Sequence, residues 1–244
     1  MAGHNKWSKV KHIKGPADAK RAKIFSKLSR EIFVAVKEGA SDDPDLNPRL
    51  RMVLLKARQA NMPLDNVQRA IQKATGEGSG ASYQDLTYEI YGPHGVAVMA
   101  EISSDNKNRT AAEIRHILGK NGGTIASAGA VTRLFHRKGQ IMIARDSADE
   151  EKVMEIALEA GAEDFNSELE GYEIITEPNA FEGVLKQIED ANIPTETAGI
   201  TFLPELLSPV PANAVESIQK LMDTLEDHDD VKDVYSNAEF ANGD

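Results

Sequence analysis

Cysteine is absent from the 244 residues of the chain. Without thiols the protein has no disulfide scaffold, no cysteine nucleophile and no thiolate ligand for a metal, and a reducing compartment is the expected environment. The sequence also lacks an apolar run as long as a membrane span, so we expect no membrane association. Because no apolar segment follows the first basic residues, we expect no secretory signal either. Together these absences favour the cytoplasm.

Recognisable catalytic patterns are missing as well. The sequence has no G-x-S-x-G motif, and its six histidines are scattered. The run GKNGG at 119–123 lacks the full phosphate-loop pattern and stands where a helix needs a glycine to end. Most carboxylates between 146 and 196 fall on the polar faces of expected helices. We therefore predict no enzymatic activity, no cofactor, no metal and no small-molecule substrate.

Acidic residues are scarce only near the N-terminal end. Residues 1–30 hold nine Lys or Arg and a single acid, Asp18. Residues 1–75 contain 16 basic and 7 acidic side chains, whereas residues 139–205 contain 3 basic and 17 acidic ones, in a chain of formal net charge −11. This polarity indicates a polyanionic partner at the basic end and charge-based exclusion at the other. The acidic domains could also recruit a protein partner.

Apolar spacing predicts three helices after a basic arm at 1–16. The first helix runs from Ala17 to Gly39, and its apolar stripe is Ile24, Phe25, Leu28, Ile32 and Val36. Asn47 is expected to cap the second helix, with Pro48 at its first position. The third helix ends at Gly76, before a flexible linker at 76–82.

The spacing changes to that of strands beyond residue 82. Strands are expected at 83–92, 95–104 and 130–137, with a helix between the last two that begins at a Thr110/Glu113 capping box. The next stretch follows the order strand, helix, strand, strand, helix, strand. Its elements are expected at 140–145, 149–160, 162–166, 171–176, 178–191 and 197–203. That order is the split βαββαβ arrangement of ferredoxin-like domains.

The last helix (211–226) and strand (231–239) have no partner next to them in the chain. We expect them to return and cover the sheet formed by residues 83–136. The predicted fold class is α+β, with an N-terminal three-helix bundle and two ferredoxin-like α/β sandwich domains, the third domain being inserted in the second. The predicted domains are 1–78, 79–138 together with 206–244, and 139–205.

Basic side chains of the arm and first helix are the candidate binding residues. The lysines of the arm recur every two or three residues, and helical spacing puts Lys20, Lys23, Lys27 and Arg30 along one side. A surface built only for solubility normally mixes charge signs, so this side is typical of a polyanion site, although a plain solvated face is the alternative. The candidate residues are Lys6, Trp7, Lys9, Lys11, His12, Lys14, Lys20, Arg21, Lys23, Lys27 and Arg30. Trp7 could stack on a base or anchor the arm to the helices.

A second basic group lies between residues 107 and 138. It could form a side wall for the same polyanion or simply serve helix caps and hairpin ends. Its members are Lys107, Arg109, Arg115, Lys120, Arg133, Arg137 and Lys138. We favour the structural alternative for Arg133 and leave both open for Arg109 and Arg115.

Several segments together resemble the YebC/PmpR family. They are MAGHNKW, KHIK, DAKRAKIFSKL, NPRLR, YEIYGPHGVAVM, SDNKNRTAAEIRHIL and LFHRKG. The resemblance is dense from residue 2 to about 139, and the acidic half matches only loosely. It implies a three-domain fold and a cytoplasmic regulatory protein without known enzymatic activity. Bacterial relatives are described as probable transcriptional regulators that bind DNA, and others as a mitochondrial activator of translation and ribosome-associated factors.

Two functions follow from these expectations. The first is a DNA-binding transcriptional regulator that grips phosphates with its basic arm and first helix. No helix-turn-helix recognition helix is evident, so we expect the protein to contact the phosphate backbone of DNA and not the base edges. The alternative is a ribosome-associated translation factor that binds ribosomal RNA and relieves stalling, because RNA is also a polyanion.

Overall fold

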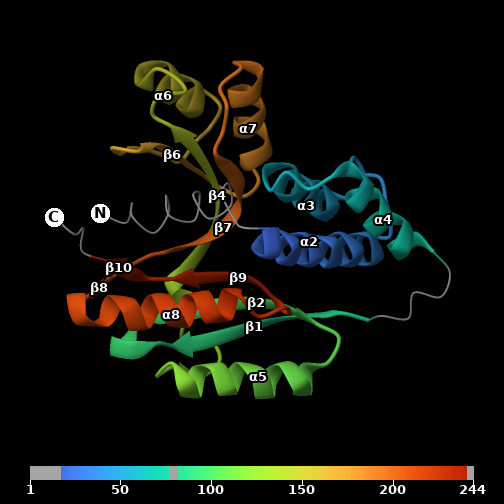
Figure 1. Ribbon diagram of the computed structural model, residues 1–244. Coiled ribbons are helices and arrows are strands. Elements are labelled where there is room, and N and C mark those ends of the chain that lie inside the picture. Colours follow the sequence, from blue (N-terminus) through green and yellow to red (C-terminus); the bar gives the residue numbers. More distant parts are fainter. Residues whose placement is uncertain (1–17, 77–81, 241–244) are drawn as a thin grey trace.

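The computed structural model describes residues 18–76 and 82–240 and is a mixed α/β protein (Figure 1). Within these residues it has seven α-helices and three sheets. The helices are α2 (Asp18–Gly39), α3 (Pro48–Gln59), α4 (Leu64–Thr75), α5 (Lys107–Lys120), α6 (Glu150–Glu159), α7 (Phe181–Asp190) and α8 (Val215–Glu226). The strands are β1 (Gln84–Tyr91), β2 (Ala97–Ser104), β3 (Thr124–Ile125), β4 (Phe135–Ala144), β5 (Asp164–Ser167), β6 (Gly171–Thr176), β7 (Thr197–Pro204), β8 (Ser208–Val210), β9 (Val231–Ser236) and β10 (Ala238–Phe240). Short 3-10 helices are η1 (Pro93–Gly95), η2 (Thr132–Leu134) and η3 (Ala212–Ala214).

Helices α2, α3 and α4 pack around one apolar core. Leu28 and Ile32 of α2 are buried in it together with Leu50 of α3 and Val67 of α4, as the helical spacing predicts. The chain between α2 and α3 is fixed by Asn47, whose Oδ1 accepts from the Leu50 amide at 3.0 Å. Its Nδ2 donates to the carbonyls of Ala35 and Ser41, both at 2.8 Å. The predicted cap is therefore confirmed and also ties the two helices together.

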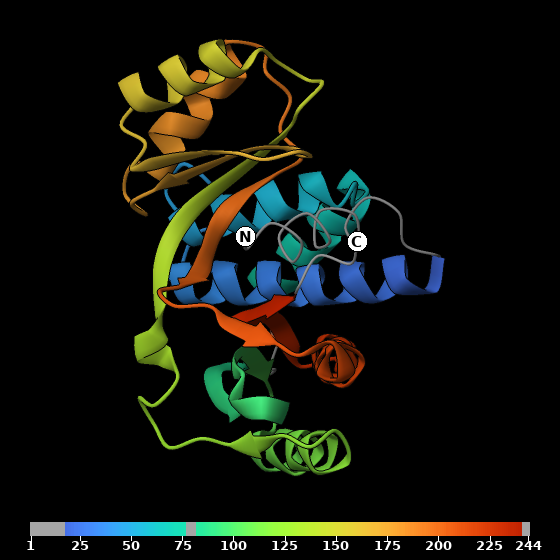
Figure 2. The same cartoon turned by 90° about the vertical axis from the view of Figure 1, so that its left-hand side faces the viewer.

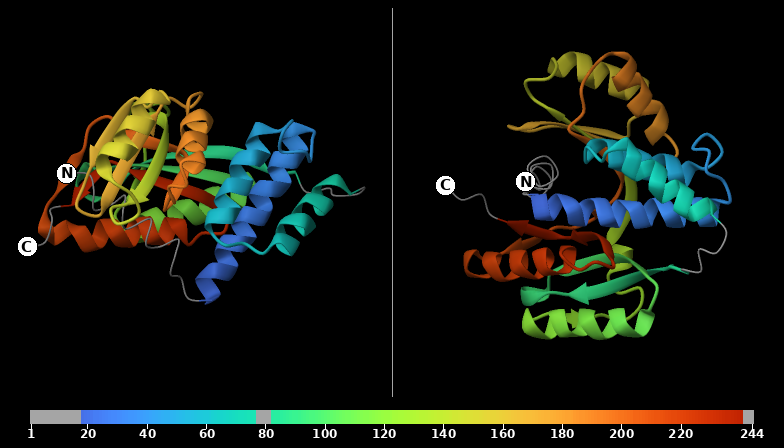
Figure 3. Two further views of the ribbon diagram at one scale, coloured as in Figure 1. Left: turned by 90° about the horizontal axis from the view of Figure 1, so that it is seen from above. Right: turned by 45° about the vertical axis from the view of Figure 1, so that its right-hand side comes forward.

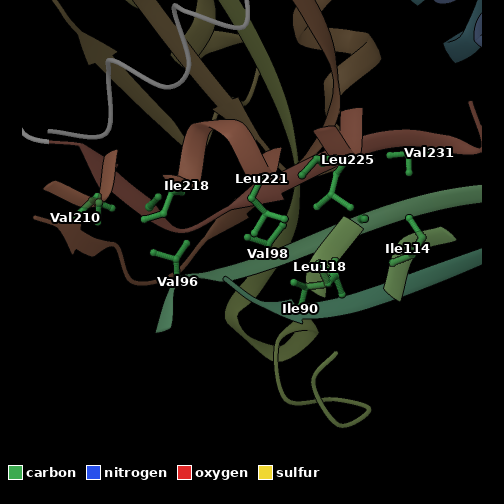
Figure 4. Packing of buried hydrophobic residues seen from close by; sticks show 14 of the residues in the cluster. Ile90, Val96, Val98, Ile114, Leu118, Val210, Ile218, Leu221, Leu225 and Val231 are labelled. Atoms are coloured by element: carbon green, nitrogen blue, oxygen red, sulfur yellow. The ribbon is translucent and has the colours of Figure 1, made fainter. Parts of the chain in front are cut away.

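The first sheet has the strand order β3-β1-β2-β9 and is antiparallel throughout. Strand β9 comes from the C-terminal part of the chain and pairs with β2 from Val98↔Ser236 to Ile102↔Val231. Helices α5 and α8 cover one face of this sheet. Figure 4 shows Leu118 of α5 and Leu221 of α8 pointing toward Ile90 and Val98 of the strands. Burial of this aliphatic layer joins the C-terminal helix and strand to the first sheet.

The second sheet has the strand order β5-β6-β4-β7. With β4 counted first in the chain, this is the antiparallel order of a split βαββαβ unit. Helices α6 and α7 pack on the sheet through Val153, Ala157, Val184 and Ile188, all of which are buried. This part of the chain therefore has the ferredoxin-like arrangement that its element order predicts.

Strands β4 and β7 form a ribbon between the two sheets. They pair from Phe135↔Pro204 to Met142↔Thr197. Phe135 packs in a small cluster with residues of the first sheet, whereas Ile141 lies in the core of the second. Figure 2 shows the ribbon running between the two layers. The boundary proposed at residue 138 falls inside this ribbon, and the three-domain division stays a proposal.

Two local details differ from the sequence-based expectations. Residues 130–134 are not a strand, because the chain there forms a turn and η2 before β4 begins at Phe135. Helix α5 begins at Lys107 with Asn106 as its cap, so the Thr110/Glu113 capping box is wrong. Thr110 is instead buried within the helix.

The first sheet also departs from the ferredoxin-like order that was expected for both sandwich domains. Its β1 and β2 form a hairpin at the centre, and the next strand, β3, pairs with β1 for only two residues. The chain then leaves for the second sheet before returning through α8 and β9. A separate pair, β8 and β10, is parallel and was not anticipated.

The helical domain lies beside both sheets. Helix α2 runs along the first sheet on the side away from α5, and α3 lies nearer to the second sheet (Figures 1 and 3). Helices α6 and α7 occupy the opposite end of the molecule from α5 (Figure 1). No helix within the described ranges has both the length and the apolar character needed to cross a bilayer.

Candidate nucleic-acid interface

The structure places only part of the predicted binding set. Six of these residues lie outside the described ranges, namely Lys6, Trp7, Lys9, Lys11, His12 and Lys14. The other five, from Lys20 to Arg30, lie on α2. Lys20 and Arg21 are exposed near the start of the helix. The role of all eleven in binding stays a prediction.

Three cations on one side of α2 contact segment 226–230, which joins α8 to β9. Lys23 Nζ donates to the Asp227 carbonyl at 3.0 Å, and Lys27 Nζ donates to the Glu226 carbonyl at 2.5 Å. Arg30 donates to the Asp229 carbonyl at 3.0 Å and to Asp230 Oδ1 at 2.8 Å. Helical spacing does bring these side chains to one side, as predicted, but that side faces another part of the chain.

The partners of the two lysines explain this docking. Helix α8 ends at Glu226, and the last carbonyls of a helix carry partial negative charge without intrahelical donors. Lys23 and Lys27 supply those donors from α2. Burial lowers the pKa of Lys27, and the neighbouring acids Glu226 and Asp233 oppose that effect. The contact therefore gives the last carbonyls of α8 hydrogen-bond donors, and Lys27 loses part of its hydration in return.

Asp230 joins α2, α5 and segment 226–230. Its side chain is 5% exposed. Oδ1 accepts from Arg30 of α2, while Oδ2 accepts from Arg109 at 2.7 Å and from the Thr110 hydroxyl at 2.6 Å. Burial alone would raise the pKa of Asp230, but the hydrogen bonds from Thr110 and Arg109 and the charges of Arg109 and Arg30 outweigh it and lower that pKa. The carboxylate is thus held ionised between two arginines.

Helix α3 is attached to both sheets by polar contacts. Lys56 donates to Asp233 of β9 at 2.8 Å and lies 3.5 Å from Glu31 of α2. Burial raises the pKa of Glu31 despite the attraction of Lys56. In the second α/β layer, Arg51 contacts Glu182 of α7 at 3.0 Å, and the Gln59 side chain donates to a β7 carbonyl at 2.9 Å. Charged and polar groups therefore hold the helical domain in place.

The structure divides the second basic group into paired and exposed members. Lys138 contacts Glu163 and Glu177, and Arg109 contacts Asp105 and Asp230. Lys107, Arg115, Lys120, Arg133 and Arg137 are exposed. For Arg109 the structure supports a positioning role at the junction of α5 with segment 226–230, a role that no local pattern indicated because Asp230 is 121 residues away.

One cluster among the described residues has the composition of a metal site: Glu113, His228 and Asp230. Its hydrogen bonds point to another role. The Asp230 amide donates to His228 Nδ1 at 3.1 Å, so the ring proton belongs on Nε2, which lies 2.9 Å from Glu113 Oε2. Both ring nitrogens are engaged, and Arg109 supplies positive charge to both carboxylates. The cluster therefore suits a hydrogen-bonded junction better than a cation.

The described residues define an α+β protein whose cations lie on surfaces and at contacts between elements. Comparison with protein families shows which family the chain belongs to. Residues 5–77 match the model described as the TACO1/YebC protein N-terminal domain. Residues 83–238 match the model described as the TACO1/YebC second and third domain. The chain belongs to the TACO1/YebC family.

Individual relatives extend over nearly the whole chain. A protein from Acidobacterium capsulatum is 47% identical over 97% of this chain and 96% of its own length. One from Geobacter sulfurreducens is 49% identical over 99% of this chain and 97% of its own length. Both are named "probable transcriptional regulatory protein", which supports a regulatory role here.

A solved structure shares the fold. The crystal structure of a conserved hypothetical protein from Aquifex aeolicus is similar with a TM-score of 0.83 and 40% sequence identity. The match covers 95% of this chain and 96% of that one. The α+β fold expected from the sequence is therefore confirmed.

Proposed function

We propose that this chain is a DNA-binding transcriptional regulator without catalytic activity, and that its N-terminal region contacts DNA phosphates. The observation that carries the proposal is the separation of charge. The basic region 1–75 includes Lys20 and Arg21, which are exposed, while the acidic region 139–205 forms most of the second sheet and its helices. Positive charge on one region attracts a phosphate backbone, and the acidic domain is repelled from it.

Within α2 we divide the predicted residues by their contacts. Lys20 and Arg21 keep their predicted assignment to phosphate binding, together with the predicted residues of the arm, because both are exposed. Lys23, Lys27 and Arg30 are assigned mainly to holding segment 226–230, because nucleic acid would have to displace those contacts. We also propose a cytoplasmic location, where a DNA-binding regulator of a bacterial type would meet its target.

The salt dependence of DNA binding tests this proposal. If about six cations meet phosphates, a plot of log affinity against log salt should have a slope of about −5 for duplex DNA. Changing Lys9, Lys11 and Lys14 to Gln should make that slope shallower by about 2 to 3. A matched variant with exposed Lys152, Lys186 and Lys220 changed to Gln loses the same charge elsewhere. An affinity that does not respond to salt would rule the mechanism out.

A ribosome-associated translation factor is the second candidate. It is favoured by the way exposed cations are spread over separate elements, including α2 and α5, since an irregular RNA surface can be met at several separate points. Sedimentation of lysate at low and high salt separates the candidates. Co-migration with ribosomal subunits, lost in the variant at Lys9, Lys11 and Lys14, would favour RNA, whereas enrichment of particular promoter fragments would favour DNA.

A further inference from the structure

Helix α5 presents an outward face that is rich in positive charge. Thr110, Ile114 and Leu118 face the first sheet and are buried. The opposite side exposes Arg115 and Lys120. The other exposed residues of α5 are Lys107, Asn108, Arg109, Ala112, Glu113, His116 and Gly119. We call the exposed positions Asn108, Ala112, Arg115, His116, Gly119 and Lys120 the α5 outer face. Lys107 is exposed at the N-terminal end of the helix, on the line of Ile114 and Leu118.

The only acid of α5, Glu113, is engaged by partners outside the outer face. Glu113 is 2.9 Å from His228 Nε2 and 3.8 Å from Arg109 Nε. Arg109 in turn is directed toward Asp105 and Asp230. The contacts to Asp230 and His228 lie along the border of α5 that meets segment 226–230, and Lys120 follows on the same border seven residues after Glu113. Lys107, Arg115 and Lys120 form no ion pair with any other described residue, so their charges face solvent.

The first turn of α5 breaks a local rule that the other helices of the two sheets obey. Helices α6, α7 and α8 each have glutamate in the first turn, which the positive end of the helix dipole favours. Helix α5 has no acid there and begins with Lys107. A cation at a helix N-terminus is electrostatically unfavourable in isolation, and it becomes favourable when an anion binds both the cation and the helix end.

The shape of the face also suits a long polyanion. Ala112 and Gly119 leave the middle of the exposed side low, and a side chain at Gly119 would meet open space. The three cations extend over about 20 Å of helix axis at 1.5 Å per residue. That length spans several phosphates of one DNA strand. Neighbouring α8 carries Glu216, Asp223 and Glu226, which would turn a polyanion away from α8 and along α5.

We propose that the α5 outer face, together with Lys107, binds the phosphate backbone of duplex DNA as a second contact surface, separate from the N-terminal region. Lys107, Arg115 and Lys120 supply the charge, and Arg109 positions the helix through Asp230. The inference rests on the proposed function for its partner, but it concerns a different surface. Helices α2 and α5 lie on opposite sides of the first sheet (Figure 1), so bound DNA would contact the molecule at two places.

The test compares three full-length variants and the wild type on one duplex DNA by fluorescence anisotropy over a range of salt concentrations. The α5 variant carries Lys107→Gln, Arg115→Gln and Lys120→Gln. The arm variant carries Lys9→Gln, Lys11→Gln and Lys14→Gln. The control carries Lys152→Gln, Lys186→Gln and Lys220→Gln, which are exposed lysines of α6, α7 and α8. All three lose the same charge, and circular dichroism verifies their folding.

We expect the slope of log affinity against log salt to become shallower by about 2 to 3 in the α5 variant and to stay unchanged in the control. DNA should also protect Lys107 and Lys120 of the wild type from acetylation, as read by mass spectrometry. If the α5 variant keeps the wild-type salt slope while the slope of the arm variant becomes shallower, the α5 surface is overturned and the proposed function stands. If the α5 variant loses affinity for structured RNA but not for duplex DNA, the choice of DNA as the partner is overturned. Absence of DNA binding by the wild type would overturn both.

Discussion

Helices α2 and α5 are both rich in lysine and arginine, yet they use these residues differently. Lys23, Lys27 and Arg30 of α2 end on carbonyls and a carboxylate of segment 226–230. Lys107, Arg115 and Lys120 of α5 face solvent. The two helices meet the same residue, Asp230, from opposite sides. Basic composition alone therefore does not identify a binding surface, because the partners within the chain decide which cations are available.

The largest effect should come from breaking the junction itself. Asp230→Asn keeps the shape of the side chain but removes its charge. Its NH2 group would also face at least one of the three groups that donate to Asp230, namely Arg30, Arg109 and the Thr110 hydroxyl. Loss of charge-assisted hydrogen bonds at a buried site should lower the free energy of unfolding by about 2 kcal/mol. For a chain of this size that corresponds to a fall in Tm of about 4–8 °C, which calorimetry would measure.

Asp229→Asn is the matched control for that variant. Asp229 is exposed, and Arg30 contacts its backbone carbonyl rather than its side chain. Its substitution should change the free energy of unfolding by less than about 0.5 kcal/mol. Equal Tm values for the two variants would show that Asp230 does not hold the helices together.

The same junction predicts a dependence of stability on pH. Because the pKa of Asp230 is lowered in the folded chain, the unfolded chain binds more protons in acid, where an unperturbed Asp titrates near pH 3.9. The stabilisation is therefore complete above about pH 5 and is lost as the pH falls through the folded value. Urea unfolding of wild type and Asp230→Asn should give a difference that shrinks below about pH 4. A difference that stays constant down to pH 3 would contradict the ionised junction.

A smaller effect is expected for a cation of α2. Lys27→Met removes the donor to the Glu226 carbonyl at the end of α8 but keeps the apolar stem. Since the site is partly exposed, the free energy of unfolding should fall by about 1 kcal/mol. The salt slope for DNA should stay near that of the wild type, since this lysine is occupied by the chain. If Lys27→Met made the salt slope shallower and left the free energy of unfolding unchanged, Lys27 would belong with the phosphate-binding residues and not with those that hold segment 226–230.

Local patterns in the sequence predicted the parts of the fold that depend on neighbouring residues. Asn47 and Pro48 mark the start of α3, and the strand expected at 171–176 coincides with β6. Thr110 was assigned to a cap because its hydroxyl and Glu113 have the right spacing. Its hydroxyl instead contacts Asp230, 120 residues away, besides the Ser104 hydroxyl and the Asn106 carbonyl. No local pattern predicts the contact with Asp230.

The same limit applies to the candidate site. Helical spacing correctly placed Lys23, Lys27 and Arg30 on one side of α2, because that property depends only on the helix. It could not show that the side is covered by segment 226–230, about 200 residues later. The available charge of α5 could be found only once Arg109 and Glu113 were seen to contact Asp230 and His228 of segment 226–230.

The smallest effect on stability should come from α5, and it completes the contrast with α2. Arg115 is exposed, and Arg115→Met should change the free energy of unfolding by less than about 0.5 kcal/mol. The salt slope for duplex DNA should nevertheless become shallower by about 0.9, the value for one phosphate contact. Urea unfolding and anisotropy on the same preparation measure the two quantities. Lys27→Met should therefore lower stability without changing the salt slope, whereas Arg115→Met should change the salt slope without lowering stability. If both variants changed the same quantity, contacts within the chain would not distinguish structural cations from binding cations.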